Sequence, residues 1–299
     1  MVTIIQSALN QEESADEIIV VDDGSTDNSL EIAERFSRTI TIIAKKNGGQ
    51  ASAYNSGFAA SSGDLVCFLD ADDLLYPNAV SVWKAASAPG ISKLHCTLDT
   101  IDAEGRPMKR KIPFIIHSGE ILPTYLRIGD YAGPPSSGNV YSRGCLEMIF
   151  PLPEAQWRYG SDSLPFHAAP IYGEIKTVPT FGAYRIHQSS SGGGLNGIPV
   201  RAACQILERD ALRRISFLAP HFEKRNLIGC NQAWSPSFLK ILARASTAGQ
   251  SALQSDFLAK CWRSCMTYPG YPAFVRIVLF LHLLGVHLEN RLTVPAAAK

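Results

Sequence analysis

The sequence lacks the features that would place it in several common classes of protein. Its 299 residues carry 28 basic and 27 acidic side chains, a net charge of +1, so no excess of positive charge points to nucleic acid. The seven cysteines are scattered and form no CxxC pair, which does not suit a disulfide framework. No signal peptide is visible. These absences predict a reduced, cytoplasmic compartment and no nucleic-acid partner.

The sequence also lacks an apolar run long enough to cross a membrane. Its most apolar segment, residues 274–288, is too short for a span and is interrupted by Arg276, His282 and His287. A buried helix is the simpler interpretation of this segment. An interfacial helix in peripheral contact with a membrane is the sharper alternative, so membrane association through residues 274–288 stays open.

Two motifs of nucleotide-dependent enzymes are missing as well. No GxGxxG motif follows the first clear strand, which argues against a dinucleotide-dependent oxidoreductase. Nucleotidyltransferases share an α/β layout and Mg²⁺-binding carboxylates, but they usually show an early glycine-rich loop with basic residues. That loop is not found here, so both classes are disfavoured.

What the sequence does contain is typical of a globular α/β protein, with 46% hydrophobic and 18% charged residues. Residues 17–21, EIIVV, form a continuous apolar run, as in a strand buried on both faces. A polar turn follows, and Leu30, Ala33 and Phe36 then give one apolar side to a helix. Residues 39–43 are the next expected strand. This spacing of strand, helix and strand predicts a βαβ unit and a parallel sheet.

The pattern predicts further elements along the chain. Expected helices cover residues 51–60, 77–86 and 163–169, and expected strands cover residues 65–69, 94–101, 112–116, 139–142 and 178–185. Residues 1–11 are ambiguous: residues 2–5 suit a strand stub, and residues 5–9 suit the end of a helix. Residues 189–197, rich in serine and glycine, are expected to be a mobile loop. After Pro199 the pattern is helical.

Three carboxylates follow directly on the expected strand 65–69. Asp70, Asp72 and Asp73 would be costly at the end of a buried strand unless positive charge lies beside them. A divalent cation that itself carries phosphate meets that need with hard oxygen ligands. The carboxyl ends of strands are where ligands collect in open α/β sheets. A simple polar turn is the alternative, since Asp is common in turns.

The ordered set of motifs resembles the family 2 glycosyltransferases, which have a GT-A fold. The matching pieces are EIIVVDDGSTDNS at residues 17–29, NGGQASAYNSGFAASSGD at residues 47–64 and FLDADD at residues 68–73. Weaker matches are SGNVYSR at residues 137–143, YGSD at residues 159–162 and YRIHQSS at residues 184–190. A lone DxD would mean little, but these pieces stand in the family's order over roughly residues 5–191.

The resemblance implies the fold class and the division of the chain. It implies a Rossmann-like GT-A domain over residues 1–198, with a mixed, mainly parallel sheet flanked by helices. Residues 1–92 would form the nucleotide-sugar half, and residues 93–198 the acceptor half. Residues 199–299 would be a helical C-terminal region.

The resemblance also implies a reaction. A sugar would pass from a nucleotide-diphospho-sugar, by default a UDP-sugar, to an acceptor hydroxyl, with inversion and with Mg²⁺ or Mn²⁺ as cofactor. The acceptor would be an unknown glycan, lipid or protein, in polysaccharide or cell-envelope glycan synthesis. The family's donor-binding positions fall on Asp22, Asp23, Asn47 and Asp70. Its metal positions fall on Asp72 and His187, although an ordinary strand-end histidine is an equal interpretation of the latter. Its general base falls on Asp162.

The sequence departs from the family in two places. Residues 6–11, QSALNQ, match only the end of the family's first helix, so the usual first strand is apparently lacking. Loss of a central strand would expose backbone groups and apolar surface. It therefore motivates an alternative function, a truncated non-catalytic relative that binds a sugar nucleotide or a partner. The milder departure is Ser161, where the family often has an acid before the base.

Overall fold

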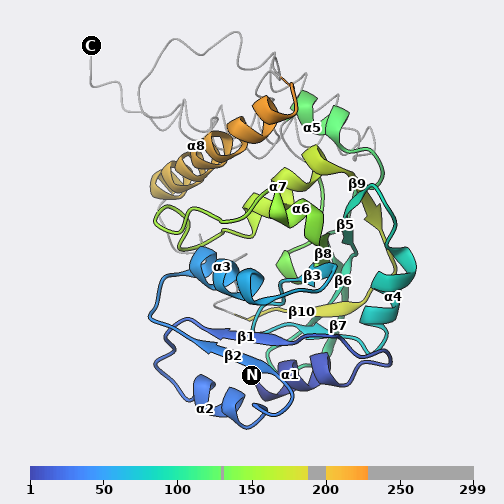
Figure 1. The fold of residues 1–299 in the computed structure, drawn as a ribbon, viewed down its shortest axis with the longest axis vertical. Helices are drawn as coiled ribbons and strands as arrows, with labels where there is room; N and C mark the ends of the chain where they lie inside the picture. The colour runs from blue at the N-terminus through green and yellow to red at the C-terminus, as the bar shows by residue number, and fades with distance from the viewer. Residues whose placement is uncertain (129–130, 188–199, 228–299) are drawn as a thin grey trace. The chain divides into compact units, whose positions relative to one another are not determined.

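The computed structural model describes residues 1–128, 131–187 and 200–227, which belong to two compact units (Figure 1). The first unit comprises residues 1–121 and 132–190, and the second comprises residues 122–131 and 191–299. The first unit carries every residue that the sequence places in the site. The expected division of this unit into donor and acceptor halves stays a prediction.

The first unit begins with a helix. Helix α1 (Val2–Leu9) precedes strand β1 (Ile19–Asp22), helix α2 (Ser29–Glu34) and strand β2 (Thr41–Ala44). Strands β1 and β2 pair in parallel from Ile19–Thr41 to Asp22–Ala44, which confirms the expected βαβ unit. Figure 1 shows α1 and α2 on one side of this strand pair and helix α3 on the other. The strand stub that residues 2–5 could have formed is not there, because these residues belong to α1.

The acidic residues of the DxD motif lie between two short strands. Helix α3 (Gln50–Ala60) leads to strand β3 (Leu65–Cys67), and strand β4 (Leu74–Leu75) and helix α4 (Ala79–Ala86) come after the acidic turn. Strand β3 ends at Cys67, earlier than the expected Leu69. The turn therefore begins before Asp70, so the backbone of the three aspartates is not paired with a neighbouring strand.

The rest of the unit holds six strands, and three of the expected boundaries are wrong. The elements are β5 (Ile91–His95), β6 (Leu98–Ile101), β7 (Pro107–Ile112), the 3-10 turn η1 (Ser136–Gly138), β8 (Asn139–Ser142), α6 (Arg143–Glu147), α7 (Ser163–Tyr172), β9 (Glu174–Thr177) and β10 (Gly182–Arg185). The single strand expected over residues 94–101 is two strands, because the chain passes from one sheet to another after His95. The strand expected over residues 112–116 lies earlier in the chain, as β7 at Pro107–Ile112, and pairs with β6. Of the strand expected over residues 178–185, only residues 182–185 form a strand, which is β10.

The strands of the described residues form three sheets with mixed pairing. Their orders are β1-β2, β4-β10-β6-β7 and β3-β8-β5-β9. Pairing is parallel at β1-β2, β10-β6 and β5-β9, and antiparallel at the four other contacts. The expected mixed pairing is therefore confirmed, but the expected parallel majority is wrong. The physical reason is β8, which runs antiparallel to both of its neighbours, β3 and β5.

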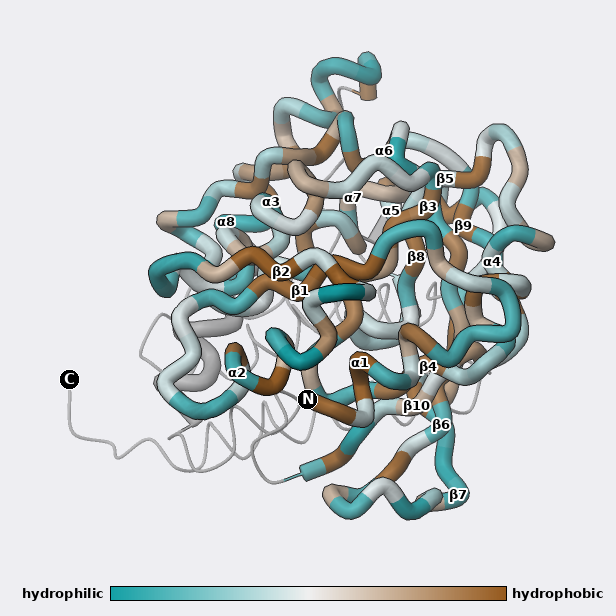
Figure 2. Tube along the Cα trace, turned by 60° about the horizontal axis from the view of Figure 1, so that its bottom comes forward, coloured by the Kyte–Doolittle hydropathy of each residue, from teal (hydrophilic) through white to brown (hydrophobic). Residues whose placement is uncertain are grey.

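A core of apolar side chains holds the strands and α4 together. Its buried members include Val80, Trp83, Leu94, Val140 and Phe181, and the rings of Trp83 and Phe181 meet edge to face at 5.4 Å. Figure 2 shows the contrast along the chain between the hydrophobic strands β1 and β2, in brown, and the hydrophilic edge strand β7, in teal. Edge strands that carry lysine and proline resist pairing with other chains, and β7 has this composition.

The second unit contains helix α5 (Leu122–Ile128) and helix α8 (Val200–Lys224). Within it the Tyr125 and Phe222 rings stack at 6.4 Å. The helix expected after Pro199 is confirmed over residues 200–224. The loop expected at residues 189–197 and the apolar segment 274–288 lie outside the described residues. No helix among those that the structure describes is long and apolar enough to cross a membrane.

Candidate donor and acid–base site

The acidic turn after β3 is held by the segment that precedes β8. The hydroxyl of Ser136 donates to Asp70 Oδ2 at 2.8 Å, and the backbone N–H of Asp70 donates to Ser137 Oγ at 3.0 Å. Both serines are buried. Burial, helped by the charge of Asp162, raises the pKa of Asp70 to about 7 against the lowering effect of the Ser136 hydrogen bond. Two segments far apart in sequence thus fix one carboxylate.

Asp73 has a structural place in this turn. Its side chain is fully buried, and Oδ1 accepts a hydrogen bond from the backbone N–H of Arg185 at 2.8 Å. Burial raises the pKa of Asp73 to about 6. Asp73 therefore faces the protein and ties the turn to β10.

Asp72, in contrast, is partly exposed and reaches toward β10 with its carboxylate. Its Oδ2 lies 2.7 Å from Nε2 of His187, and the two side chains are 40% and 26% exposed. The guanidinium of Arg185 donates to the backbone carbonyl of Asp72 at 2.8 Å. The structure thus brings together the two residues that the family resemblance places at the metal. Within the described residues no group of three or more His, Cys, Asp or Glu side chains is arranged to hold a metal ion.

Asp162 lies at the N-cap of α7, where the helix dipole favours negative charge. Burial raises the pKa of Asp162 above its usual range. Its charge acts on Asp70 and also on the buried hydroxyl of Tyr54, whose pKa is raised mainly by burial and then by these two carboxylates. Asp70 and Asp162, which are far apart in sequence, therefore lie close enough for the charge of Asp162 to act on Asp70 and for both charges to act on Tyr54.

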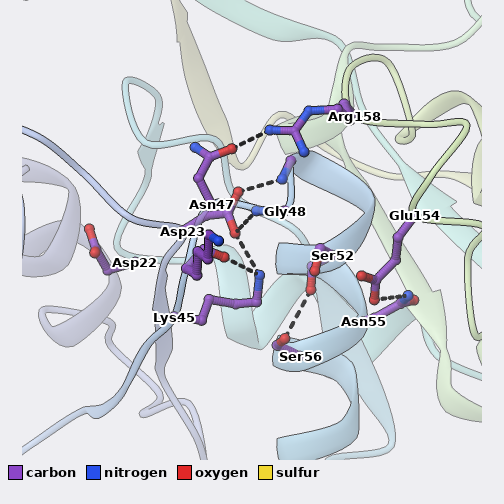
Figure 3. Close-up of polar contacts among 12 residues, drawn as sticks. Asp22, Asp23, Lys45, Asn47, Gly48, Ser52, Asn55, Ser56, Glu154 and Arg158 are labelled. Atoms are coloured by element: carbon purple, nitrogen blue, oxygen red, sulfur yellow. Dashed lines mark hydrogen bonds and ion pairs between the residues drawn. The ribbon is translucent and has the colours of Figure 1, made fainter.

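Asp23 is the centre of a separate network at the start of α3 (Figure 3). Its Oδ1 accepts from Lys45 Nζ at 2.7 Å and from the backbone N–H of Gly48 at 2.9 Å, and its Oδ2 accepts from the backbone N–H of Gly49 at 2.6 Å. Burial works to raise the pKa of Asp23, but these hydrogen bonds and the charge of Lys45 outweigh it, so the pKa is lowered. Asp23 is therefore a stable carboxylate that anchors the loop before α3.

The other expected donor-binding residues divide between two places. Asn47 is exposed, and its Oδ1 accepts from the guanidinium of Arg158, so it lies beside the Asp23 network (Figure 3). Asp22 is buried and is not part of that network, because its carboxylate accepts from the backbone N–H of Ser25 at 3.3 Å. The adjacent aspartates that sequence reasoning treated as a pair thus have different partners.

Several residues of the site were not expected from the sequence. Lys45 stood next to a recognised motif, and its charge three residues before the two glycines was a usable signal. Ser136 gave none, and Ser137 and Arg185 lay inside the weaker matches at residues 137–143 and 184–190 with no role assigned to them. They contact the acidic turn only through the pairing of distant strands. These residues hold the carboxylates in place. The structure therefore identifies positioning residues that the sequence did not predict, whereas the candidate reactive residues were already predicted.

The fold of these elements is that of the GT-A glycosyltransferases, as the sequence led us to expect. The structure of S. aureus TarS 1–349 in complex with UDP-GlcNAc is similar, with a TM-score of 0.54 at 15% sequence identity, covering 96% of this chain and 84% of that one. The TarS 1–349 structure without that ligand gives a TM-score of 0.51 at 14% identity, with the same coverage. At this identity the likeness shows the fold alone.

Residues 2–142 match the family described as Glycosyl transferase family 2, and this segment of the chain belongs to that family. A glycosyltransferase of Nostoc sp., itself uncharacterized, is 35% identical over 200 residues, which are 62% of this chain and 61% of that protein. The O-antigen biosynthesis protein RfbC of Myxococcus xanthus is 38% identical over 122 residues, and the chondroitin synthase of Pasteurella multocida is 40% identical over 81 residues. These matches cover 38% and 26% of this chain, but only 9% and 8% of the two relatives.

Proposed function

We propose that this protein transfers a sugar from a nucleotide-diphospho-sugar, with a UDP-sugar as the first candidate, to an acceptor hydroxyl. The observation that carries the proposal is the gathering of Asp70, Asp162 and the Asp72–His187 pair, from three separate segments, around one turn. Buried carboxylates with raised pKa values cluster at functional sites. Membership of the glycosyltransferase family and the UDP-GlcNAc bound to TarS support this class of donor.

The residues around Asp72 fit a divalent cation. Asp72 offers a hard carboxylate oxygen and His187 an imidazole, and both side chains are partly exposed. Mg²⁺ is usually bound by one or two carboxylates together with waters and substrate phosphates, so a full protein cage is not required. Asp72 and His187 would hold the ion. When bound, Mg²⁺ or Mn²⁺ supplies positive charge against the diphosphate as the glycosidic bond breaks.

On the donor side, Asn47 and the Asp23 network would receive the nucleotide. Asn47 is exposed and accepts from the guanidinium of Arg158, and the Lys45 ammonium contacts Asp23. Asp23 retains acceptor capacity on Oδ2, which has a single hydrogen bond from Gly49. A carboxylate can accept the N–H of a uracil ring, and this pairing would favour UDP over other nucleotides.

Asp162 would act as the general base. Its raised pKa makes the carboxylate a better proton acceptor than a free aspartate. It would take the proton from the acceptor hydroxyl while that oxygen attacks the anomeric carbon, and the nucleoside diphosphate would leave from the opposite face. A single displacement of this kind inverts the anomeric centre. The acceptor would be a hydroxyl of a glycan, a lipid or a protein.

The experiment measures UDP release from UDP-GlcNAc by the purified chain in Mn²⁺, with and without candidate acceptors. We expect release that needs the metal and that Asp72→Ala abolishes, while Glu31→Ala, a change on the exposed surface of α2, keeps it. Release that is equal in the wild type and in Asp72→Ala would exclude the proposed metal site. Binding of UDP-GlcNAc without turnover under any condition would favour a non-catalytic sugar-nucleotide binder.

A further inference from the structure

The first residue of α3 contacts the backbone of the segment that ends in Asp162. The N–H of Gln50 donates to the carbonyl of Arg158 at 2.8 Å, and the N–H of Ser161 donates to Gln50 Oε1 at 2.8 Å. The next residue extends the contact, since the N–H of Ala51 donates to the carbonyl of Trp157 at 3.2 Å. Ser161 is fully buried, so its N–H has no access to water if the side chain of Gln50 is lost.

The residue before Gln50 joins the same segment to Asp23. Gly49 donates its N–H to Asp23 Oδ2 at 2.6 Å, and its φ of +90° is a conformation that favours glycine. A Cβ atom on Gly49 would lie only 2.6 Å from Cα of Arg158. Two consecutive residues therefore have Asp23 on one side and the backbone of residues 158–161 on the other (Figure 3 shows Gly48, Asp23 and Arg158 of this neighbourhood).

We propose that Gln50 is a positioning residue for Asp162, and that through Gly49 it couples the placement of this base to the donor carboxylate Asp23. The inference rests on the proposed function, because it assigns the base of that reaction a support. Gln50 holds both ends of residues 158–161, because its N–H donates to the Arg158 carbonyl and its Oε1 accepts from the Ser161 N–H. Binding of the donor beside Asp23 would then affect the position of Asp162 through Gly49 and Gln50.

The same helix provides a matched control. Asn55 donates to the carbonyl of Leu152 at 2.9 Å and accepts from the N–H of Leu152 at 2.7 Å. It therefore makes side-chain contacts of the same chemistry, to the same segment, but at the end far from Asp162. Asn55 also donates to Glu154 Oε1 at 3.0 Å, so its loss removes more side-chain hydrogen bonds than the loss of Gln50 does. It therefore tests stability stringently without touching the residues next to the base.

The kinetic test compares Gln50→Met, Gln50→Glu and Asn55→Met by UDP release from UDP-GlcNAc in Mn²⁺. Gln50→Met keeps the length of the side chain and loses the acceptor, so we expect kcat to fall by about 10- to 100-fold with KM for the donor within about twofold. Gln50→Glu keeps an acceptor for the Ser161 N–H and should recover most of kcat. Asn55→Met should lose no more than about threefold. Equal losses in Gln50→Met and Asn55→Met, or a loss confined to KM, would overturn the inference.

A second readout does not depend on turnover. Hydrogen exchange of the peptide that covers residues 158–163 is measured with and without UDP and Mn²⁺, in the wild type and in Gln50→Met. We expect UDP to slow exchange there in the wild type and to have no such effect in the variant. If the wild type releases no UDP from UDP-GlcNAc, the proposed function fails, and this measurement still decides the coupling. Identical exchange in both proteins would refute it.

Discussion

Two aspartates of the site show how surroundings set the behaviour of one kind of side chain. Asp23 meets a lysine and two backbone N–H groups, and its pKa is lowered in spite of burial. Asp162 is half-buried at a helix N-terminus, and loss of solvent around its carboxylate raises its pKa. The first is suited to holding a charge, and the second to exchanging a proton. The roles proposed for them follow from this difference.

Asp162→Asn tests the base directly. The amide cannot accept the proton of the acceptor hydroxyl, so transfer should fall by about 10²- to 10⁴-fold. The affinity for UDP in Mn²⁺, measured by calorimetry, should change little, because Asp162 is not among the residues proposed to bind the nucleotide. A variant that transfers at the wild-type rate would remove Asp162 from the mechanism.

A buried histidine gives a prediction about stability and pH. His95 is fully buried in β5 with Nε2 2.7 Å from the carbonyl oxygen of His117, and burial lowers the pKa of His95 to about 2. Below about pH 6.5 the His95 imidazole binds a proton in the unfolded chain but stays neutral in the folded chain. The free energy of unfolding is therefore highest above that pH and decreases as the pH falls below it. Between pH 7 and pH 5 this loss is about 2 kcal/mol in the free energy of unfolding.

The measurement is urea unfolding of the wild type and of His95→Gln at both pH values. The glutamine keeps a donor for the His117 carbonyl but does not titrate. We expect the wild type to lose about 2 kcal/mol more than the variant between pH 7 and pH 5. Taking the difference cancels other groups, such as Asp70 and Asp73, whose raised pKa values act in the opposite direction. Parallel curves for the two proteins would show that His95 does not set this dependence.

At the scale of elements, the sequence predicted those helices and strands that depend on interactions between residues close together in the chain. The βαβ unit of β1, α2 and β2 and the helices α3 and α7 were predicted near their observed positions, because apolar runs and periodicity act within a few residues. The change of sheet after His95 was not predictable, since it depends on which strands lie beside β5 and β6. The candidate reactive residues were predicted from the resemblance, but the serines beside Asp70 were not, because strand pairing brings them there.

The loop before α3 provides the prediction at this scale. Gly49→Ala places a Cβ 2.6 Å from Cα of Arg158 and strains a backbone with φ of +90°, so it should destabilise the fold by at least about 1 kcal/mol. Gly144→Ala is the matched control, since Gly144 lies in α6 and a Cβ there meets nothing within 4 Å. That change should be neutral or stabilising by up to about 1 kcal/mol. Urea unfolding of both variants is the measurement, and similar losses would mean that the contact with Arg158 yields easily.

For the whole molecule, ligand binding and folding are linked. A donor that binds the folded chain at about 100 times its Kd stabilises it by about 2.7 kcal/mol. We therefore expect UDP-GlcNAc with Mn²⁺ to raise the Tm of the full chain, and to do so much less in Asp72→Ala or when EDTA is present. AMP at the same concentration is the control ligand. A rise in Tm that is unchanged by EDTA would show that the nucleotide binds without the metal.

One side chain of β10 reaches further than its position suggests. The guanidinium of Arg185 donates to the carbonyl of Asp72 and, at 3.1 and 3.0 Å, to the carbonyls of Asp102 and Ala103 in the connection between β6 and β7. Lysine has no planar fork and would leave most of these oxygens without a donor. Substitutions in the turn between β6 and β7 can therefore shift the position of Asp72 through Arg185. A search for variants with altered metal dependence should include this turn, although it is not among the residues proposed to contact the donor or the cation.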